Sequence, residues 1–267
     1  GKYCLLHMHN VQGKDAEVER FFTYDSPLKG ANFPVGIQLL IRDLLNLSGA
    51  AASDPNIQAA LQLLDGAAAT QMLRQKAIID ANGNLTLSSA GIDALQAELD
   101  VFNSTTPLAA ITRYIALSNG CETGVKQESV TSEVAMAYIL TLDGVPGEST
   151  PYWLYDIIIS GIAYTANETA THLFNRNIWV WPTLGLGDPF IQDSVSYDHP
   201  TPLGLDVAPG GSSNIGVSIL GDVLNNAFAN IEDQIGYSVS VPLDHFCFVP
   251  TVSSFDLPVT TNLFDPI

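Results

Sequence analysis

The sequence predicts a single α/β domain built on a mainly parallel β-sheet, with a helical cap and an antiparallel β-hairpin insertion. Three observations predict this class. An apolar strand, Arg20–Tyr24, ends abruptly in the polar loop Asp25–Asn32; amphipathic helices follow; and a second apolar strand, Ile111–Ser118, comes after them. Consecutive strands joined by a helical crossover almost always pack as parallel neighbours. We therefore expect Arg20–Tyr24 and Ile111–Ser118 to lie side by side.

The segment between these two strands is predicted to be a helical cap or crossover over residues 36–110. Apolar residues that recur at about 3.6-residue spacing indicate amphipathic helices. Four segments have this pattern: Gly1–Asn10, Pro34–Leu47, Asp54–Ile79 and the stretch from the capping residues Ser88 and Ser89 to about Phe102. The turn sequence Ala81–Asn84 separates the last two of them.

The second half of the chain has the sequence pattern of β-strands, with apolar runs bounded by turn residues. Turn residues separate three apolar runs, Val134–Leu142, Tyr152–Tyr164 and Leu173–Trp181. This spacing is typical of long β-hairpins, and it predicts an antiparallel insertion over residues 125–200, beside the parallel sheet. The remainder is predicted to be a Gly- and Pro-rich loop at Thr183–Ser213, a helix at Ile215–Ile235 and a last short strand at Phe246–Val252.

Composition excludes several classes of function. The chain has 267 residues, 28 acidic and 10 basic side chains, and a formal charge of −18. Such a charge repels phosphate backbones, so we expect no nucleic-acid partner. The most apolar run, Tyr152–Tyr164, is shorter than the ~20 residues that cross a bilayer, so we expect no membrane span. Cys4, Cys121 and Cys247 form no C-x-x-C pair and are interpreted as buried apolar residues.

Polar side chains follow the predicted strands at their carboxyl ends. Asp25 and Ser26 follow the first strand, Asn119 follows the second, and Asp256 comes after the last. Because parallel strands present their carboxyl ends at one edge of a sheet, these loops are expected to line a common cleft. Asp25, Ser26 and Asn119 are the predicted pocket residues.

Several short strings carry a resemblance to a known family. They are Asp25-Ser26-Pro27, Gly30-Ala31-Asn32, RYIALSNG at 113–120, Ala208-Pro209-Gly210-Gly211 and Phe248–Ser253. Together they resemble lipase- and esterase-like α/β-hydrolases, in a branch of secreted proteins of Bacteroidota-type bacteria. The resemblance covers most of the chain and implies an α/β-hydrolase-like fold, a secreted or cell-surface location and an ester or lipid-like substrate. It implies no cofactor.

The nucleophile of such a hydrolase is expected outside these residues. No G-x-S-x-G elbow occurs in the chain, and Ser212, Ser213 and Ser48 lack its glycine spacing. In the resembling family the elbow directly precedes a helix like KYCLLHMHN, which places the serine upstream of Gly1 and makes this chain an internal to C-terminal portion. The same resemblance places the triad histidine beyond Ile267.

A serine triad also needs an acid, which follows the serine in this type of fold. The candidate acids are Asp206, Asp244 and Asp256, all late in the chain. Of the histidines, only His245 lies beside a late strand, and because it precedes that strand we interpret it as structural. We predict no metal site and interpret Asp188, Asp193 and Asp198 as a solvated acidic segment.

Two other functions are compatible with the sequence. One is a non-catalytic extracellular structural, adhesion or assembly protein that reuses the hydrolase fold, since free hairpin edges suit lateral association with other proteins. The other is a carbohydrate-binding module, in which tryptophan faces stack on a sugar; the candidates are Trp153, Trp179 and Trp181.

Overall fold

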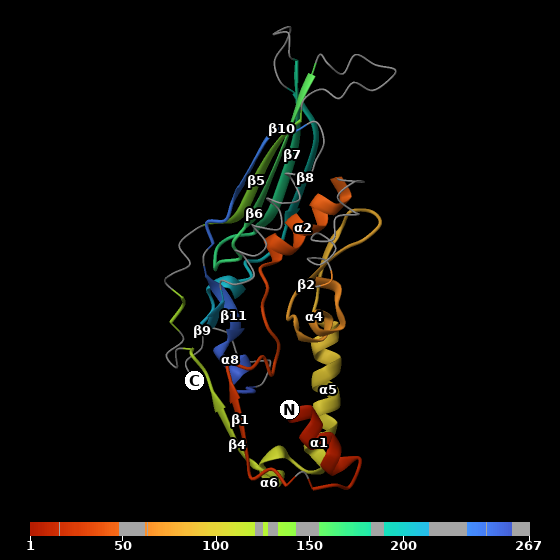
Figure 1. Ribbon diagram of the computed structural model, residues 1–267, viewed down its shortest axis with the longest axis vertical. Helices are drawn as coiled ribbons and strands as arrows, with labels where there is room; N and C mark the ends of the chain where they lie inside the picture. The colour runs from red at the N-terminus through yellow and green to blue at the C-terminus, as the bar shows by residue number, and fades with distance from the viewer. Residues whose placement is uncertain are drawn as a thin grey trace.

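The computed structural model describes residues 1–15, 17–47, 62, 64–120, 125–127, 133–142, 155–182, 190–213, 234–243 and 245–257. The molecule is elongated (Figure 1). One end carries a long antiparallel sheet and helix α2, and the other carries the paired strands β1 and β4 with α1, α5 and α6. Strands β9 and β11 lie between the two ends.

The two-stranded sheet confirms the first prediction. β1 (Arg20–Tyr24) and β4 (Arg113–Leu117) pair in parallel, with Phe22 opposite Ile115. The chain between them forms α2 (Val35–Leu47), α4 (Ala67–Met72), α5 (Ala90–Thr105) and α6 (Leu108–Ile111). Helix α1 (Lys2–Asn10) also forms as predicted.

The end of the predicted second helix is wrong, because a small β-hairpin forms there. Residues predicted as the end of that helix instead form β2 (Lys76–Ile79), which pairs antiparallel with β3 (Leu85–Ser88) across the predicted turn. The run Lys76–Ile79 continues the apolar pattern of the preceding helix, so local periodicity does not separate the two. Its β-conformation depends on the partner strand β3, which is a non-local contact.

The predicted fold class is wrong, because the largest sheet is antiparallel. It has the strand order β10-β5-β6-β7-β8, while the parallel sheet has only two strands. The strands are β5 (Val134–Leu142), β6 (Tyr155–Tyr164), β7 (His172–Pro182), β8 (Phe190–Asp198) and β10 (Gln234–Ser240). The hairpins expected as an insertion at 125–200 are therefore the main sheet. Antiparallel neighbours need only short connections, such as the one from β6 to β7.

Two further departures occur late in the chain. The predicted loop at Thr183–Ser213 contains β8, the short 3₁₀ helix η3 (Leu205–Val207) and β9 (Gly210–Ser213). The last strand forms as β11 (Phe246–Pro250), pairs antiparallel with β9, and runs into a one-turn helix, α8 (Thr251–Ser254). Most of the predicted helix Ile215–Ile235 lies outside the described residues.

Two apolar clusters stabilise the fold. In the larger one, α2 packs on one face of the antiparallel sheet, with Ile37 and Leu40 against Met136 and Phe174. Within it, the buried side chain of Arg176 donates to Asp43, at 3.0 Å, and to Asp193. The smaller cluster joins α1, α5 and α6 through Leu6, Leu99 and Leu108. Its burial fixes α1 beside the parallel strands.

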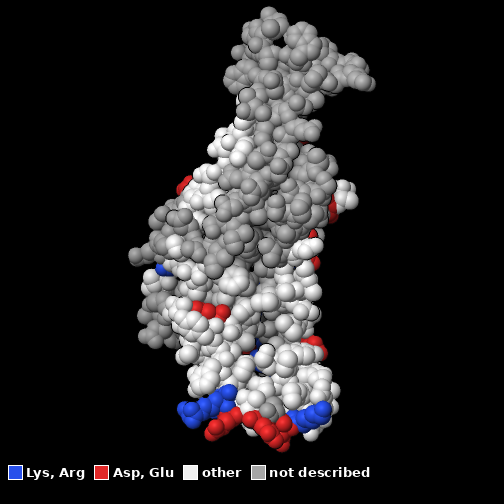
Figure 2. Space-filling view, in the orientation of Figure 1, with Lys and Arg blue, Asp and Glu red and all other residues white. Residues whose placement is uncertain are grey.

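Charged groups are unevenly distributed on the face seen in Figure 2. Lys, Arg, Asp and Glu gather at the end of the molecule that carries α6 and the start of β1. The described surface between that end and the antiparallel sheet is mostly uncharged in this view. No described helix is long and apolar enough to cross a membrane.

Candidate active site

The carboxyl ends of β1 and β4 meet in a hydrogen-bonded cluster. Asp25 continues the ladder by donating its backbone N–H to Leu117 O, at 2.9 Å. Its Oδ1 accepts the backbone N–H of Asn119 at 2.7 Å, and the hydroxyl of Tyr24 donates to Asn119 Oδ1. The structure therefore brings the predicted pocket residues Asp25 and Asn119 together.

The backbone of Asp25 is in an unfavourable conformation. Its φ of +41° lies in the left-handed region, which non-glycine residues adopt at a cost. The hydrogen bond to Asn119 compensates, because it holds the carboxylate across the ends of both strands. Ser26 has a weaker arrangement, since its hydroxyl makes only a long contact, 3.4 Å, to Tyr24 O.

Two glycines allow later segments to close on this cluster. A Cβ at Gly211 of β9 would lie 2.8 Å from Asp25 Cγ, and one at Gly120 would lie 1.6 Å from Thr251 Oγ1. Both distances are shorter than a side chain permits. β9 and the start of α8 therefore approach the strand ends as closely as backbone alone allows.

Asp256 follows α8 and lies between two lysines. Lys2 Nζ donates to its Oδ2, and Lys29 Nζ lies 3.4 Å from its Oδ1. Asp256 also has a left-handed φ of +61°. Burial raises the pKa of the Tyr114 hydroxyl on β4, and the negative charge of Asp256 raises it further. Asp256 therefore contacts the Asp25–Asn32 loop through Lys29, as predicted for these two segments.

The two oxygens of Asp256 are not equivalent. Oδ2 accepts a hydrogen bond from Lys2, whereas Oδ1 is buried, has no hydrogen bond among the described residues and lies 3.4 Å from Lys29 Nζ. The carboxylate is therefore held on one side, and the lone pairs of Oδ1 are not used by a hydrogen bond within the described chain.

Asp206 is placed differently from the other candidate acids. It is fully buried on η3, where Oδ1 accepts Asn32 Nδ2–H at 2.8 Å and Oδ2 accepts the Ala166 N–H at 2.7 Å. Burial raises its pKa to about 6, although both hydrogen bonds lower it. With each oxygen engaged inside the protein, Asp206 links η3 to the Asp25–Asn32 loop and to the connection between β6 and β7. Asp244 lies outside the described residues.

Further predicted residues lie away from this cluster. His9 contacts Asp15, His172 contacts Asp198, and His199 contacts Thr201. No histidine of the described chain hydrogen bonds to Asp25 or Asp256. Asp193 is ion-paired with Arg176 but keeps 54% of its side-chain surface exposed, and Asp188 lies outside the described residues. Among the tryptophans, only Trp179 has a described side chain, and it is partly buried.

Lys2 and Lys29 are the site residues that sequence reasoning missed. Only ten lysines and arginines occur in the chain, so a lysine within the Asp25–Asn32 loop was a usable signal for Lys29. Lys2 carried no such signal, because its contact with Asp256 spans 254 positions.

The described residues contain no group of three or more His, Cys, Asp and Glu side chains placed to hold a metal ion. Comparison with protein-family models finds no matching model, and comparisons with curated proteins and with solved structures find no significant match. The geometry of the cluster is therefore the basis for a functional proposal.

Proposed function

We propose that this chain supplies the acid and part of the pocket of a serine-type hydrolase that cleaves an ester or lipid-like acyl bond. Its nucleophile is carried by residues that precede Gly1. The observation that carries the proposal is the contact between Asp256 and Lys2, because it places a carboxylate, one of whose oxygens has no hydrogen bond among the described residues, at the start of α1. The resemblance puts the nucleophile directly before that helix.

Ester hydrolysis by a serine enzyme requires a nucleophile with its base, an acid that orients the base, and donors for the oxyanion. A serine Oγ attacks the acyl carbon while a histidine takes its proton, and the alcohol leaves with that proton. An acid must hold the imidazole in the correct tautomer, which Asp256 Oδ1 can do by accepting its N–H. The oxyanion needs N–H donors, and the first turn of the nine-residue α1 has unpaired backbone N–H groups and a partial positive charge.

Asp25 and Asn119 have a supporting role in this proposal. Their hydrogen bond ties the ends of β1 and β4 together. Lys2 and Lys29 act as positioning residues, since they fix the orientation of the Asp256 carboxylate. We also propose that the protein is secreted or lies at the cell surface.

A second candidate function rests on the same ion pairs. Two lysines on one carboxylate also make a purely structural link between α1, the Asp25–Asn32 loop and α8. In that case the protein is a non-catalytic extracellular assembly component. The two candidates differ in what neutralising Asp256 does to turnover.

The experiment compares Asp256→Asn with Asp100→Asn in the protein extended upstream of Gly1. Asp100 is an exposed carboxylate on α5 and serves as the matched control. Hydrolysis of p-nitrophenyl butyrate is measured as kcat/KM. We expect Asp256→Asn to lower it by roughly 10³–10⁴-fold, as the loss of a triad acid does, and Asp100→Asn to leave it unchanged.

Two results would contradict the proposal. One is equal turnover in the two variants while circular dichroism finds both folded. The other is an extended wild-type protein with no turnover above the buffer rate, which favours the structural role.

A further inference from the structure

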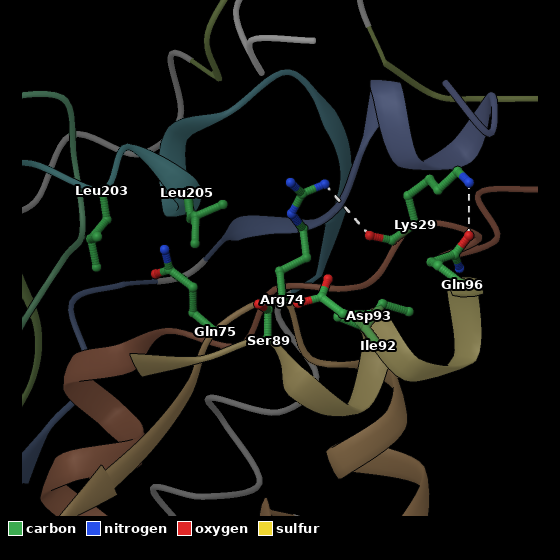
Figure 3. A pocket seen from close by; sticks show the side chains of 9 residues that line it. All are labelled: Lys29, Arg74, Gln75, Ser89, Ile92, Asp93, Gln96, Leu203 and Leu205. Atoms are coloured by element: carbon green, nitrogen blue, oxygen red, sulfur yellow. Dashed lines mark hydrogen bonds between the residues drawn. The ribbon is translucent and has the colours of Figure 1, made fainter. Parts of the chain in front are cut away.

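A small pocket lies beside the candidate active site, between α5, the start of β2 and η3. Its volume is about 240 Å³. Figure 3 shows Arg74 and Gln75 reaching into it from one side and Leu203 and Leu205 facing them from the other. Asp93 of α5 also lines it.

Arg74 is a cation without an anionic partner. Its one side-chain hydrogen bond within the described chain is a long contact, 3.5 Å, from Nη1 to Lys29 O. No described carboxylate lies within ion-pair distance of its guanidinium. Burial lowers the pKa of Arg74, and the nearby charge of Asp93 opposes that effect. A partly buried guanidinium with free donors is an uncommon arrangement, because buried charges are normally paired.

The other polar groups of the pocket are already engaged. Lys29 Nζ donates to Gln96 Oε1 at 2.7 Å and faces Asp256, and the Ser89 hydroxyl donates to Asp93 Oδ2 at 2.6 Å. Gln75 Oε1 is buried and has no hydrogen-bond partner among the described residues, but as an acceptor it offers nothing to an anion. The donors of Arg74 are therefore the groups of this polar wall that can bind an anionic ligand.

We propose that this pocket binds a short-chain carboxylate with an apolar branch. The planar guanidinium of Arg74 matches a carboxylate in a two-point contact. Ile92, Leu203 and Leu205 supply an apolar wall for the attached carbon chain. The volume is below the ~300–1,000 Å³ of pockets that hold drug-sized ligands, so the ligand is small.

The wall favours a carboxylate over a phosphate. Lys2 and Lys29 share the single carboxylate of Asp256, so Lys29 is only partly neutralised, while Arg74 keeps its full positive charge, with Asp93 close enough to act on it. Asp93 repels a phosphate dianion more strongly than a carboxylate, and a phosphate would gain nothing from the leucines. This inference does not depend on the proposed hydrolytic function, because binding is measured without turnover.

The test titrates residues 1–267 with isovalerate and, in a separate arm, with inorganic phosphate, by isothermal calorimetry. We expect isovalerate to bind more tightly than phosphate. Arg74→Gln should weaken isovalerate binding about tenfold or more, since it removes a charged hydrogen-bonding partner. The matched control is Arg113→Gln, an exposed arginine on β4, which should bind as the wild type does.

A second variant keeps the test decisive if Arg74→Gln fails to fold. Leu203 is only partly buried and packs at the edge of the larger apolar cluster, so Leu203→Trp should fill the pocket and abolish binding, and circular dichroism checks that this variant is folded. No isovalerate binding by the wild type, tighter binding of phosphate, or unchanged binding in both pocket variants would overturn the proposal.

Discussion

At the scale of single residues, the two described candidate acids differ in how their carboxylate oxygens are engaged. Asp206 is fully buried with both oxygens engaged, while Asp256 keeps one oxygen without a hydrogen bond among the described residues. Both lie late in the chain in polar, turn-like sequence. Their difference arises from what packs around each side chain, which one sequence does not reveal.

The raised pKa of Asp206 predicts a pH-dependent stability. Its pKa rises from 3.8 in the unfolded chain to about 6 in the folded protein. Over this interval the folded state holds a proton that the unfolded state has lost, so stability falls as pH rises. The contribution is on the order of 3 kcal/mol at most, from about 1.4 kcal/mol for each pH unit.

Urea unfolding at several pH values checks this expectation in the wild type and in Asp206→Asn. The free energy of unfolding of the wild type should fall relative to the variant between about pH 4 and pH 6. A constant difference across this range would mean that Asp206 stays ionised in the fold.

At the scale of elements, the close approach of β9 to the end of β1 positions the site. A Cβ at Gly211 would meet the Asp25 carboxylate, so Gly211→Ala should displace Asp25 and break its bond to the Asn119 N–H. We expect a loss of about 1–3 kcal/mol in the free energy of unfolding, as overpacking costs in cores.

Gly236→Ala on β10 is the matched control for this substitution. Nothing lies within 4 Å of a Cβ built at Gly236, so its effect should be small. Equal stability of the two variants would show that β9 is not pressed against Asp25.

The elements that sequence predicted well are those with a strong local pattern. β1, β4, α2 and α5 have clear apolar periodicity and polar boundaries, and they form close to their expected residues. β2 and β8 were missed because each depends on a neighbouring strand. Of the site, Asp25 and Asn119 lie together as predicted, since the direction of the parallel strands β1 and β4 brings their carboxyl ends to one edge. Asp256 follows β11, which pairs with β9 in a separate antiparallel sheet, so its position depends on packing rather than on strand direction.

At the scale of the whole molecule, strand pairing decided the fold class. The strands of the main sheet were largely recognised, but they were assigned to an insertion rather than to the dominant sheet. Pairing is set by contacts between distant segments, and β10 joins β5 from almost a hundred residues away, as their register indicates. Among the strands that the structure describes, β1 and β4 are the pair that keeps the predicted parallel arrangement.

The central claim concerns this parallel pair: its carboxyl ends, α1 and Asp256 belong to one catalytic centre whose serine precedes Gly1. The most direct measurement is labelling of the upstream-extended protein with a fluorophosphonate, which forms a bond to an activated serine Oγ and releases fluoride. Mass spectrometry then locates the modified residue. The account predicts a label on a serine upstream of Gly1, formed more slowly in Asp256→Asn. A label on a serine within residues 1–267, or no label at all, would contradict it.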